Sequence, residues 1–305
     1  DVERSRGLGD VYKRQGLYKF RKELIQELLD QGNEVYISLP DGELVRSLEK
    51  MGCKFVNTAV DRRGINPKTD AKLMFFYKKL IKKLHPDLVI TYTIKPNIYG
   101  GLMCRMLRVP YAVNITGLGT AFQSESAVKK LVTFLYKIAL KKAKVVFFEN
   151  IGNKQTFLDL HILKEKQICV LNGAGVNLAE YPFCEYPSEN ETRFLFIGRV
   201  MKEKGVDELF EAAERIKKQH SDVFFDVVGP MEDDYKSRIE ELVKKGVVVY
   251  HGYQKDVKPF IENCHCFVLP SYHEGMANTL LEAGAMGRPL TVSYTHLTLP
   301  TSDLV

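Results

Sequence analysis

Short apolar, β-rich stretches alternate with amphipathic stretches along nearly the whole chain. In the first half, apolar residues at three- and four-residue spacing predict helices at Leu17–Gln31, Gly42–Met51, Ala71–Leu84, Asn97–Leu107, Ala127–Lys144 and Asn153–Leu160. Between them, strands are predicted at Val35–Leu39, Phe55–Val60, Leu88–Thr93, Tyr111–Thr116, Val145–Phe148 and Ile168–Leu171. Short strands separated by helices form βαβ units, so we expect a parallel sheet covered on both faces.

The alternation pauses once and then begins again. A small-residue loop at 173–177 and a polar, Pro-containing stretch at 181–192 place the domain boundary between residues 16–177 and 178–292. The second half then predicts strands at Phe194–Ile197, Val223–Val228, Val247–Tyr250 and Cys266–Leu269, with helices at Gly205–Lys218, Asp234–Lys245, Asp256–Cys264 and Asn278–Met286. No Gly-x-Gly-x-x-Gly follows any of these strands, which argues against a nicotinamide-dependent dehydrogenase.

Length and composition agree with two soluble α/β domains. The 305 residues suit two domains of ordinary size, and 45% of them are hydrophobic. The net charge of +6 is compatible with anionic substrates or an anionic lipid surface but is too small to indicate nucleic acid. The six cysteines lack a paired metal-ligand spacing, so we expect reduced, structural thiols in a cytoplasmic protein and no bound metal.

The two ends differ from the rest. Residues 1–15 have neither helical nor strand periodicity, and residues 293–305 are rich in Thr, Leu, Pro and Ser without a sustained strand pattern. Both segments resemble translated sequencing-adaptor read-through, so we expect them to be foreign and the donor-side domain to be incomplete.

A basic loop follows the strand predicted at Phe194–Ile197. Gly198 and Arg199 end that strand, and Lys204 precedes the next helix. Arginine offers a planar fork and lysine a compact charge, so together they can neutralise a diphosphate leaving group. The alternative is a solvated turn that happens to be basic.

A second polar loop follows the strand predicted at Cys266–Leu269. Glu274 lies in the loop and can accept hydrogen bonds from sugar hydroxyls, whereas Glu282 lies further along, in the next helix, and can hold ribose hydroxyls. Gly275 permits a tight turn into a helix N-terminus suited to phosphate, formed by Met276, Ala277, Asn278 and Thr279. The alternative is that Glu274 merely starts the helix and Glu282 is an exposed helical charge.

In this order, the Gly-Arg…Lys-Gly loop and the glutamate pair resemble the donor domain of glycosyltransferase family 4, and the likeness extends from about Gly16 to Thr291. The resemblance implies a GT-B fold, in which two Rossmann-like, doubly wound parallel-sheet domains flank a cleft. It also implies a retaining reaction without metal or cofactor, with a UDP-hexose or UDP-N-acetylhexosamine as co-substrate. By position, Arg199 and Lys204 would bind the diphosphate, Glu274 the sugar and Glu282 the ribose.

Weaker matches to the family lie in other loops. Those at Gly229 and Val257 correspond to loops near the nucleobase and phosphate, although ordinary strand-to-helix turns explain them equally well. In the first half, the segments that contain Lys95, Asn97, Asn114, Gly117 and Gly119 resemble the acceptor side of the bacterial branch that extends lipid-linked polysaccharide or glycan precursors. That branch includes N-acetylgalactosaminyltransferases that act on undecaprenyl-diphosphate sugars, and enzymes of capsule and O-antigen synthesis.

Two of the predicted helices, Ala71–Leu84 and Ala127–Lys144, are amphipathic and rich in lysine. Such helices can rest on anionic lipid, which would make the protein peripheral on the inner face of the plasma membrane. Crossover helices that cover a sheet need the same apolar and solvated faces, so both explanations stay open.

Two other functions compete with sugar transfer. A UDP-sugar epimerase could use a similar two-domain cleft without any acceptor. The family's first strand and glycine loop fall where residues 1–15 stand, so the chain could also be a truncated protein that binds a sugar nucleotide and transfers nothing. We nominate no general base, and we expect His251 and His273 to position or pack.

Overall fold

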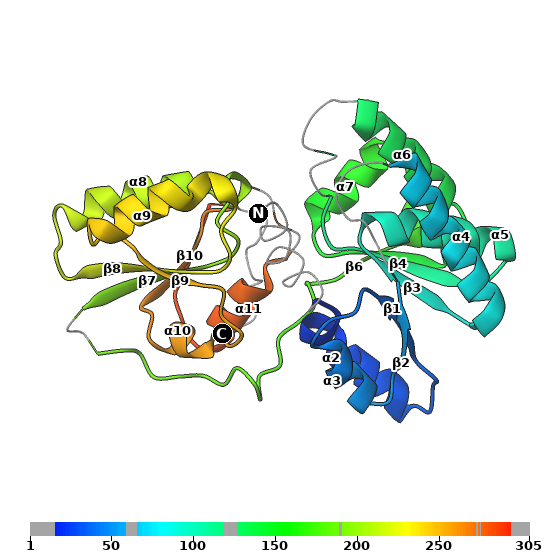
Figure 1. Cartoon of the computed structure of the whole chain (residues 1–305), viewed down its shortest axis with the longest axis horizontal. Coiled ribbons are helices and arrows are strands. Elements are labelled where there is room, and N and C mark those ends of the chain that lie inside the picture. The colour runs from blue at the N-terminus through cyan, green and yellow to red at the C-terminus, as the bar shows by residue number, and fades with distance from the viewer. Residues whose placement is uncertain are drawn as a thin grey trace. The chain divides into compact units, whose positions relative to one another are not determined.

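The computed structural model describes residues 16–58, 66–118, 122, 127–188, 191–272, 274 and 276–293. The predicted foreign segments lie outside these residues, apart from Ser293. The described residues form two compact units that divide between Ala174 and Gly175 (Figure 1).

The first unit is built from alternating helices and parallel strands. Its helices are α2 (Gly16–Asp30), α3 (Val45–Lys50), α4 (Pro67–Leu84), a π-helical turn η1 (Pro96–Gly100), α5 (Gly101–Leu107), α6 (Ala127–Leu140), α7 (Ile151–Asp159) and a 3-10 turn η3 (Glu165–Gln167). Its strands are β1 (Tyr36–Leu39), β2 (Lys54–Asn57), β3 (Val89–Tyr92), β4 (Tyr111–Ile115), β5 (Val145–Phe148) and β6 (Ile168–Val170).

These strands form two parallel sheets, β1-β2 and β3-β4-β5-β6. Helices α4, α5, α6 and α7 lie on one side of the four-stranded sheet (Figure 1). Every residue of β4 is buried, as expected for a central strand covered on both faces. The core between the sheet and its helices is aromatic, with Tyr136, Phe148 and Phe157 among its fully buried side chains.

Capping residues explain where α4 begins. The helix starts four residues before the predicted Ala71, because the side chain of Asn66 accepts the backbone N–H groups of Lys68 and Thr69, and Pro67 stands at the first helical position. Asparagine at the N-cap followed by proline is a recognised start signal, so this boundary could have been found in the sequence.

The second unit repeats the plan with a single sheet. Its strands are β7 (Thr192–Ile197), β8 (Val223–Val228), β9 (Val249–Gly252), β10 (Cys266–Leu269) and β11 (Leu290–Val292). Its helices are η4 (Lys202–Lys204), α8 (Val206–Lys217), η5 (Asp233–Tyr235), α9 (Lys236–Lys244), α10 (Lys258–Glu262) and α11 (Asn278–Ala285). The strand order is β11-β10-β7-β8-β9, with every pair parallel.

This order reverses direction at β7. From β7 the chain moves outward through β8 and β9 with α8 and α9 on one face, and then returns to β10 and β11 with α10 and α11 on the other (Figure 1). The point between β7 and β10 is therefore the topological switch point, beside which doubly wound folds bind ligands at the carboxyl ends of the strands.

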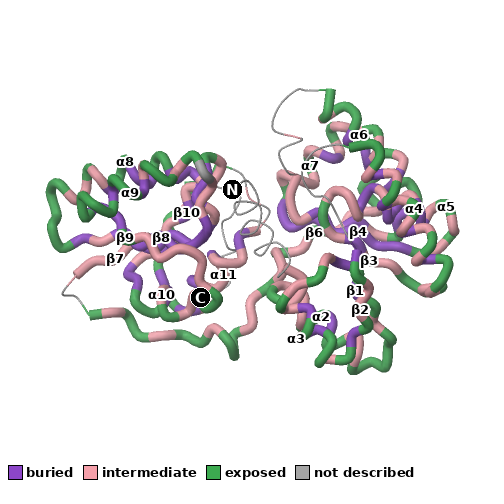
Figure 2. Tube along the Cα trace, viewed as in Figure 1, coloured by how far each residue is buried: buried purple, intermediate pink, exposed green. Residues whose placement is uncertain are grey.

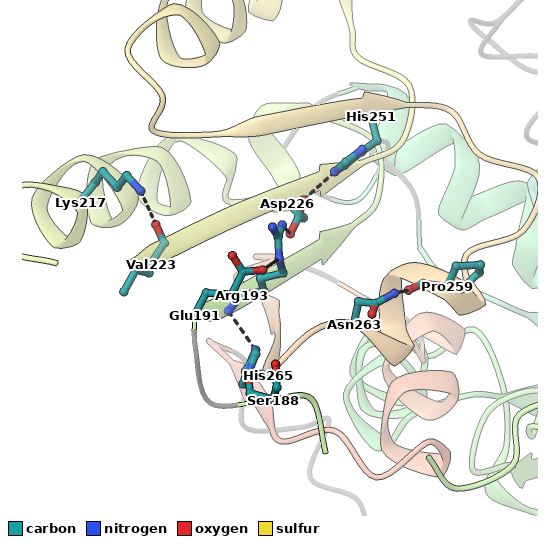
Figure 3. Close-up of polar contacts among 10 residues, drawn as sticks. All are labelled: Ser188, Glu191, Arg193, Lys217, Val223, Asp226, His251, Pro259, Asn263 and His265. Atoms are coloured by element: carbon teal, nitrogen blue, oxygen red, sulfur yellow. Dashed lines mark hydrogen bonds and ion pairs between the residues drawn. The ribbon is translucent and has the colours of Figure 1, made fainter. Parts of the chain in front are cut away.

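A polar network ties β7, β8 and β9 together inside this unit (Figure 3). Asp226 of β8 accepts from Arg193 at 3.0 Å and bonds the ring of His251 at 2.6 Å. The ring of His251 also packs edge-on against Phe260, with the centroids 4.8 Å apart. His251 therefore has the packing and positioning place that was expected of it, while His273 lies outside the described residues.

The cysteines are free thiols, and the part of the chain described here contains no group of residues arranged to hold a metal. His265, which stands between two of them, uses both ring nitrogens on backbone groups: Nδ1 accepts from the N–H of Arg193 at 3.1 Å, and Nε2 bonds the carbonyl of Ser188 at 3.2 Å (Figure 3). Burial raises the pKa of Cys104 and Cys264 to about 12, which keeps these thiols protonated. No helix among the described residues has both the length and the apolar character needed to cross a membrane.

Candidate functional site

The two polar loops predicted from the sequence meet at the switch point of the second unit. Strands β7 and β10 are neighbours, with Phe194 opposite Cys266 and Leu195 opposite Phe267, so their carboxyl ends open on the same edge. Beyond them, the N–H of Tyr272 donates to the carbonyl of Glu203 at 3.1 Å. The sequence placed each loop after a strand, and the sheet order brings the two together.

Two glycines allow close backbone contacts around the switch point, one between the loops after β7 and β10 and one between the loop after β8 and the end of β7. Gly205, at φ +66°, faces the loop after β10, and a Cβ there would lie 1.9 Å from the carbonyl oxygen of Pro270. Gly229, at φ +140°, faces the end of β7, and a Cβ there would lie 1.9 Å from the carbonyl oxygen of Gly198. Any side chain at either position would force the loops apart, because both the space and the backbone conformation favour glycine.

Lys204 and Glu274 join the two loops through their side chains. The ammonium group of Lys204 donates to Oε1 of Glu274, and the two side chains are only 20% and 13% exposed. The residue predicted to bind phosphate and the residue predicted to bind the sugar are therefore direct neighbours. An ammonium group has three N–H donors, so Lys204 can contact a phosphate while the pair remains formed.

Arg199 has a partner that the sequence did not suggest. Its guanidinium Nη1 lies 3.1 Å from Oε1 of Glu232, in the loop after β8. Backbone contacts fix this arrangement, because the N–H of Glu232 donates to the carbonyl of Val200 at 3.0 Å. Each of the two predicted diphosphate cations thus faces a glutamate.

Helix α11 begins beside these loops. Its N-cap residue, Ala277, supplies no side-chain cap, and Met276, Asn278 and Thr279 are partly exposed around it. The Oδ1 atom of Asn278 and the Oγ atom of Ser271 are buried without a hydrogen-bond partner among the described residues. Such unsatisfied atoms are uncommon in folded proteins, and these two lie at the switch point. Gly275 lies outside the described residues.

Glu282 and Val257 lie near the segment that precedes β7. The pKa of the Tyr181 hydroxyl is raised by burial and by the charge of Glu282, with which it is hydrogen-bonded. Val257 caps the start of α10, and Lys258 lies over the Tyr181 ring at 5.9 Å. Glu282 is half-buried and held by a tyrosine, which differs from an exposed helical charge.

The predicted acceptor-side residues gather at the carboxyl ends of β3 and β4. Lys95 forms a 2.8 Å ion pair with Asp70 of α4, and both side chains are nearly buried. The side-chain amide of Asn97 donates to the backbone carbonyl of Asn114 at 3.0 Å, and both residues are buried. Lys95 therefore forms part of a neutral pair. Gly117 has open space around it, and Gly119 lies outside the described residues.

Sequence reasoning missed an ion pair at this same edge. Arg21 of α2 donates to Glu149, at the end of β5, at 2.6 Å, and the guanidinium lies over the ring of Tyr92. Burial raises the pKa of Glu149, while the charge of Arg21 opposes that rise. Nearby, Thr93 has φ +69°, a strained conformation for a β-branched residue. The position of Glu149 directly after a predicted strand was the signal available in the sequence.

Comparison with known proteins identifies the chain. The family described as Glycosyl transferases group 1 matches residues 180–298, and Glycosyl transferase 4-like matches residues 14–150. The N,N'-diacetylbacillosaminyl-diphospho-undecaprenol alpha-1,3-N-acetylgalactosaminyltransferase of Campylobacter jejuni is 31% identical over 294 residues, which cover 91% of this chain and 77% of that protein. The chain belongs to the group 1 glycosyltransferases. The resemblance to family 4 inferred from the two loops is thereby confirmed.

The chain spans only part of the length of its other relatives, and solved structures share its fold. The UDP-Gal:alpha-D-GlcNAc-diphosphoundecaprenol alpha-1,3-galactosyltransferase of Escherichia coli is 28% identical over 252 residues. The aligned residues cover 76% of this chain and 64% of that protein. A Rickettsia africae glycosyltransferase structure aligns with a TM-score of 0.72 at 20% identity, covering 91% of this chain and 75% of that one. The Anabaena HepE structure in complex with UDP and glucose aligns with a TM-score of 0.68 at 16% identity, covering 88% of this chain and 75% of that one. The GT-B class predicted for the fold is confirmed.

Proposed function

We propose that this glycosyltransferase moves a sugar from a UDP-sugar, either a hexose or an N-acetylhexosamine, to a lipid-linked saccharide during synthesis of a cell-surface polysaccharide or glycan. The observation that carries the proposal is the ion pair of Lys204 with Glu274 at the switch point between β7 and β10, with Arg199 in the same loop as Lys204. The names of the Campylobacter and Escherichia relatives, both of which act on undecaprenyl-diphosphate sugars, support a lipid-linked acceptor.

The proposed chemistry follows from the charges at this edge. An acceptor hydroxyl attacks the anomeric carbon while the bond from that carbon to the diphosphate oxygen breaks, with retention of configuration. Arg199, Lys204 and the N-terminus of α11 stabilise the negative charge on the departing UDP, so no metal or other cofactor is required in this scheme. The leaving phosphate takes the acceptor's proton, which balances the step without a protein base.

Glu274 and Glu282 orient the donor in this proposal. Glu274 accepts from hydroxyls of the sugar ring, and Lys204, which is paired with it, contacts the phosphate. Glu282 accepts from the ribose, and Gly198, Gly229 and Val257 shape the surrounding loops. We place the acceptor saccharide at the carboxyl ends of β3 and β4, beside Lys95, Asn97, Asn114, Gly117 and Gly119, with the enzyme resting on the inner face of the plasma membrane.

A donor screen tests the proposal. The chain is incubated with radiolabelled UDP-sugars and a lipid-diphosphate-linked saccharide, and label that enters the organic phase is counted. Transfer from one donor is the expected result and names the sugar. Binding of a UDP-sugar without transfer to any acceptor would favour a binding protein, and conversion of the donor without acceptor would favour an epimerase.

A further inference from the structure

Two helices of the first unit present aromatic side chains to solvent. Phe75 of α4 is 62% exposed and Phe134 of α6 is 58% exposed, and Leu131 beside Phe134 is 43% exposed. Each helix already buries another face against the core, through Tyr77 and Ile81 in α4 and Tyr136 in α6. These exposed side chains are therefore not required for packing the unit.

Lysines flank both phenylalanines at helical spacing. In α4, Lys72 and Lys79 lie one turn before and after Phe75, and in α6, Lys130 and Lys137 lie one turn before and after Phe134. All four lysines are exposed, on the side of the helix opposite its buried face. The same motif, an aromatic residue between two lysines, thus occurs on both helices.

The two helices expose these motifs on the same side of the unit. Both α4 and α6 pack against η1 and against α5, which lies between them. All three helices cover one side of the β3-β4-β5-β6 sheet, and their outer turns are exposed (Figure 2). The side chains opposite the buried faces of α4 and α6 therefore point away from the sheet together.

Charge distinguishes this surface from the other helical surfaces. Helices α4, α5 and α6 are described throughout, and their one acidic residue, Asp70, is buried and paired with Lys95. Helices α8 and α9 of the second unit instead mix glutamates with their lysines and arginines. A sheet-covering helix needs a polar outer face, but it needs neither a single sign of charge nor exposed phenylalanines.

We infer that the outer surface of α4 and α6, centred on Phe75 and Phe134, binds the surface of an anionic lipid bilayer. The lysines attract anionic headgroups, and the phenylalanines and Leu131 enter the boundary between headgroups and acyl chains. This inference deepens the proposed function, because a lipid-linked acceptor is reached at a membrane surface, but the contact itself does not depend on catalysis.

Vesicle flotation tests the inference on the full chain. The vesicles contain equal parts of phosphatidylcholine and phosphatidylglycerol, or phosphatidylcholine alone, at about 0.1 M salt. We expect the wild-type chain to float with the anionic vesicles only. Replacing Lys72, Lys79, Lys130 and Lys137 by Gln should lower partitioning by more than about 100-fold, and Phe75→Ser with Phe134→Ser by at least about 10-fold.

Matched variants separate this surface from general charge and from misfolding. Replacing the exposed Lys50, Lys218, Lys236 and Lys244 by Gln removes the same charge elsewhere and should leave flotation unchanged. Arginine at positions 72, 79, 130 and 137 should restore it. UDP binding, measured separately by calorimetry, reports on the donor site, so its failure would count against the proposed function and not against the lipid surface. Absence of wild-type binding to anionic vesicles, or equal loss in the control variant, would overturn the inference.

Discussion

Lys204 and Glu274 are ion-paired although seventy positions separate them in the chain. The pair connects the loop after β7 with the loop after β10, which are adjacent only because the sheet reverses direction there. It places the group proposed to bind phosphate against the group proposed to bind sugar. A donor that contacts both would bridge the two loops.

Substitution of Lys204 tests this arrangement. Lys204→Ala removes a positive charge that would face the departing diphosphate and breaks the ion pair with Glu274, so turnover with a UDP-sugar should fall about 100- to 1000-fold. The matched control is Lys202→Ala, because Lys202 lies on the same turn but is exposed. The control should keep turnover within about two-fold of wild type. Equal effects of the two substitutions would show that only general positive charge matters.

Arg199 and Glu232 make a separate prediction about affinity. Glu232→Gln removes the carboxylate that faces the Arg199 guanidinium at 3.1 Å, so the guanidinium should interact more strongly with a diphosphate. We expect UDP to bind about 3- to 10-fold more tightly by calorimetry, and Arg199→Ala to bind it more weakly. Arg215→Ala, on an exposed part of α8, is the control. Weaker binding by Glu232→Gln would mean that Glu232 orients the arginine instead of competing with phosphate.

The close approach of the loops predicts that Gly205 and Gly229 tolerate no side chain. Gly246 has a similar φ of +67° but open space around its Cβ position, so Gly246→Ala measures the cost of conformation alone, about 1–2 kcal/mol. Gly205→Ala and Gly229→Ala add a clash with backbone and should lose at least about 2 kcal/mol more in urea unfolding. Similar losses for all three would refute the close contact.

Burial of Glu149 predicts how stability depends on pH. Because its pKa is raised in the folded chain, the folded state holds more protons than the unfolded state between the ordinary glutamate pKa of about 4.3 and the raised value. This group therefore lowers the free energy of unfolding as pH rises through that window. The free energy of unfolding is measured by urea titration at several pH values. Glu149→Gln should remove this group's contribution to the slope of that free energy against pH, and an unchanged slope would show that the carboxyl titrates as an exposed one.

Much of the fold follows from the sequence, because periodicity is a local property. Strands Val145–Phe148, Val223–Val228 and Cys266–Leu269 have the predicted bounds. Helix boundaries were less accurate: α6 ends at Leu140, four residues before the predicted Lys144. The N–H of Lys144 instead donates to Tyr111 of a neighbouring strand, and this tertiary contact overrides the helical pattern.

The site was predictable only as separate loops. Residue types and spacing identified Arg199, Lys204 and Glu274, but their partners depend on which strands are neighbours. Glu232 stands 33 positions from Arg199, in a loop with no distinctive pattern, so nothing local indicated the pair. The pair of Arg21 with Glu149 was missed for the same reason, since 128 positions separate the two residues.

Hydrogen–deuterium exchange with and without UDP tests the central claim most directly, because it locates the nucleotide without requiring an acceptor. The account predicts that UDP slows amide exchange in residues 198–205, which follow β7, and in residues 276–282, at the start of α11. Residues 236–244 in α9 should exchange at the same rate in both conditions. Protection confined to the first unit, or no protection at saturating UDP, would contradict the placement of the donor site at the switch point.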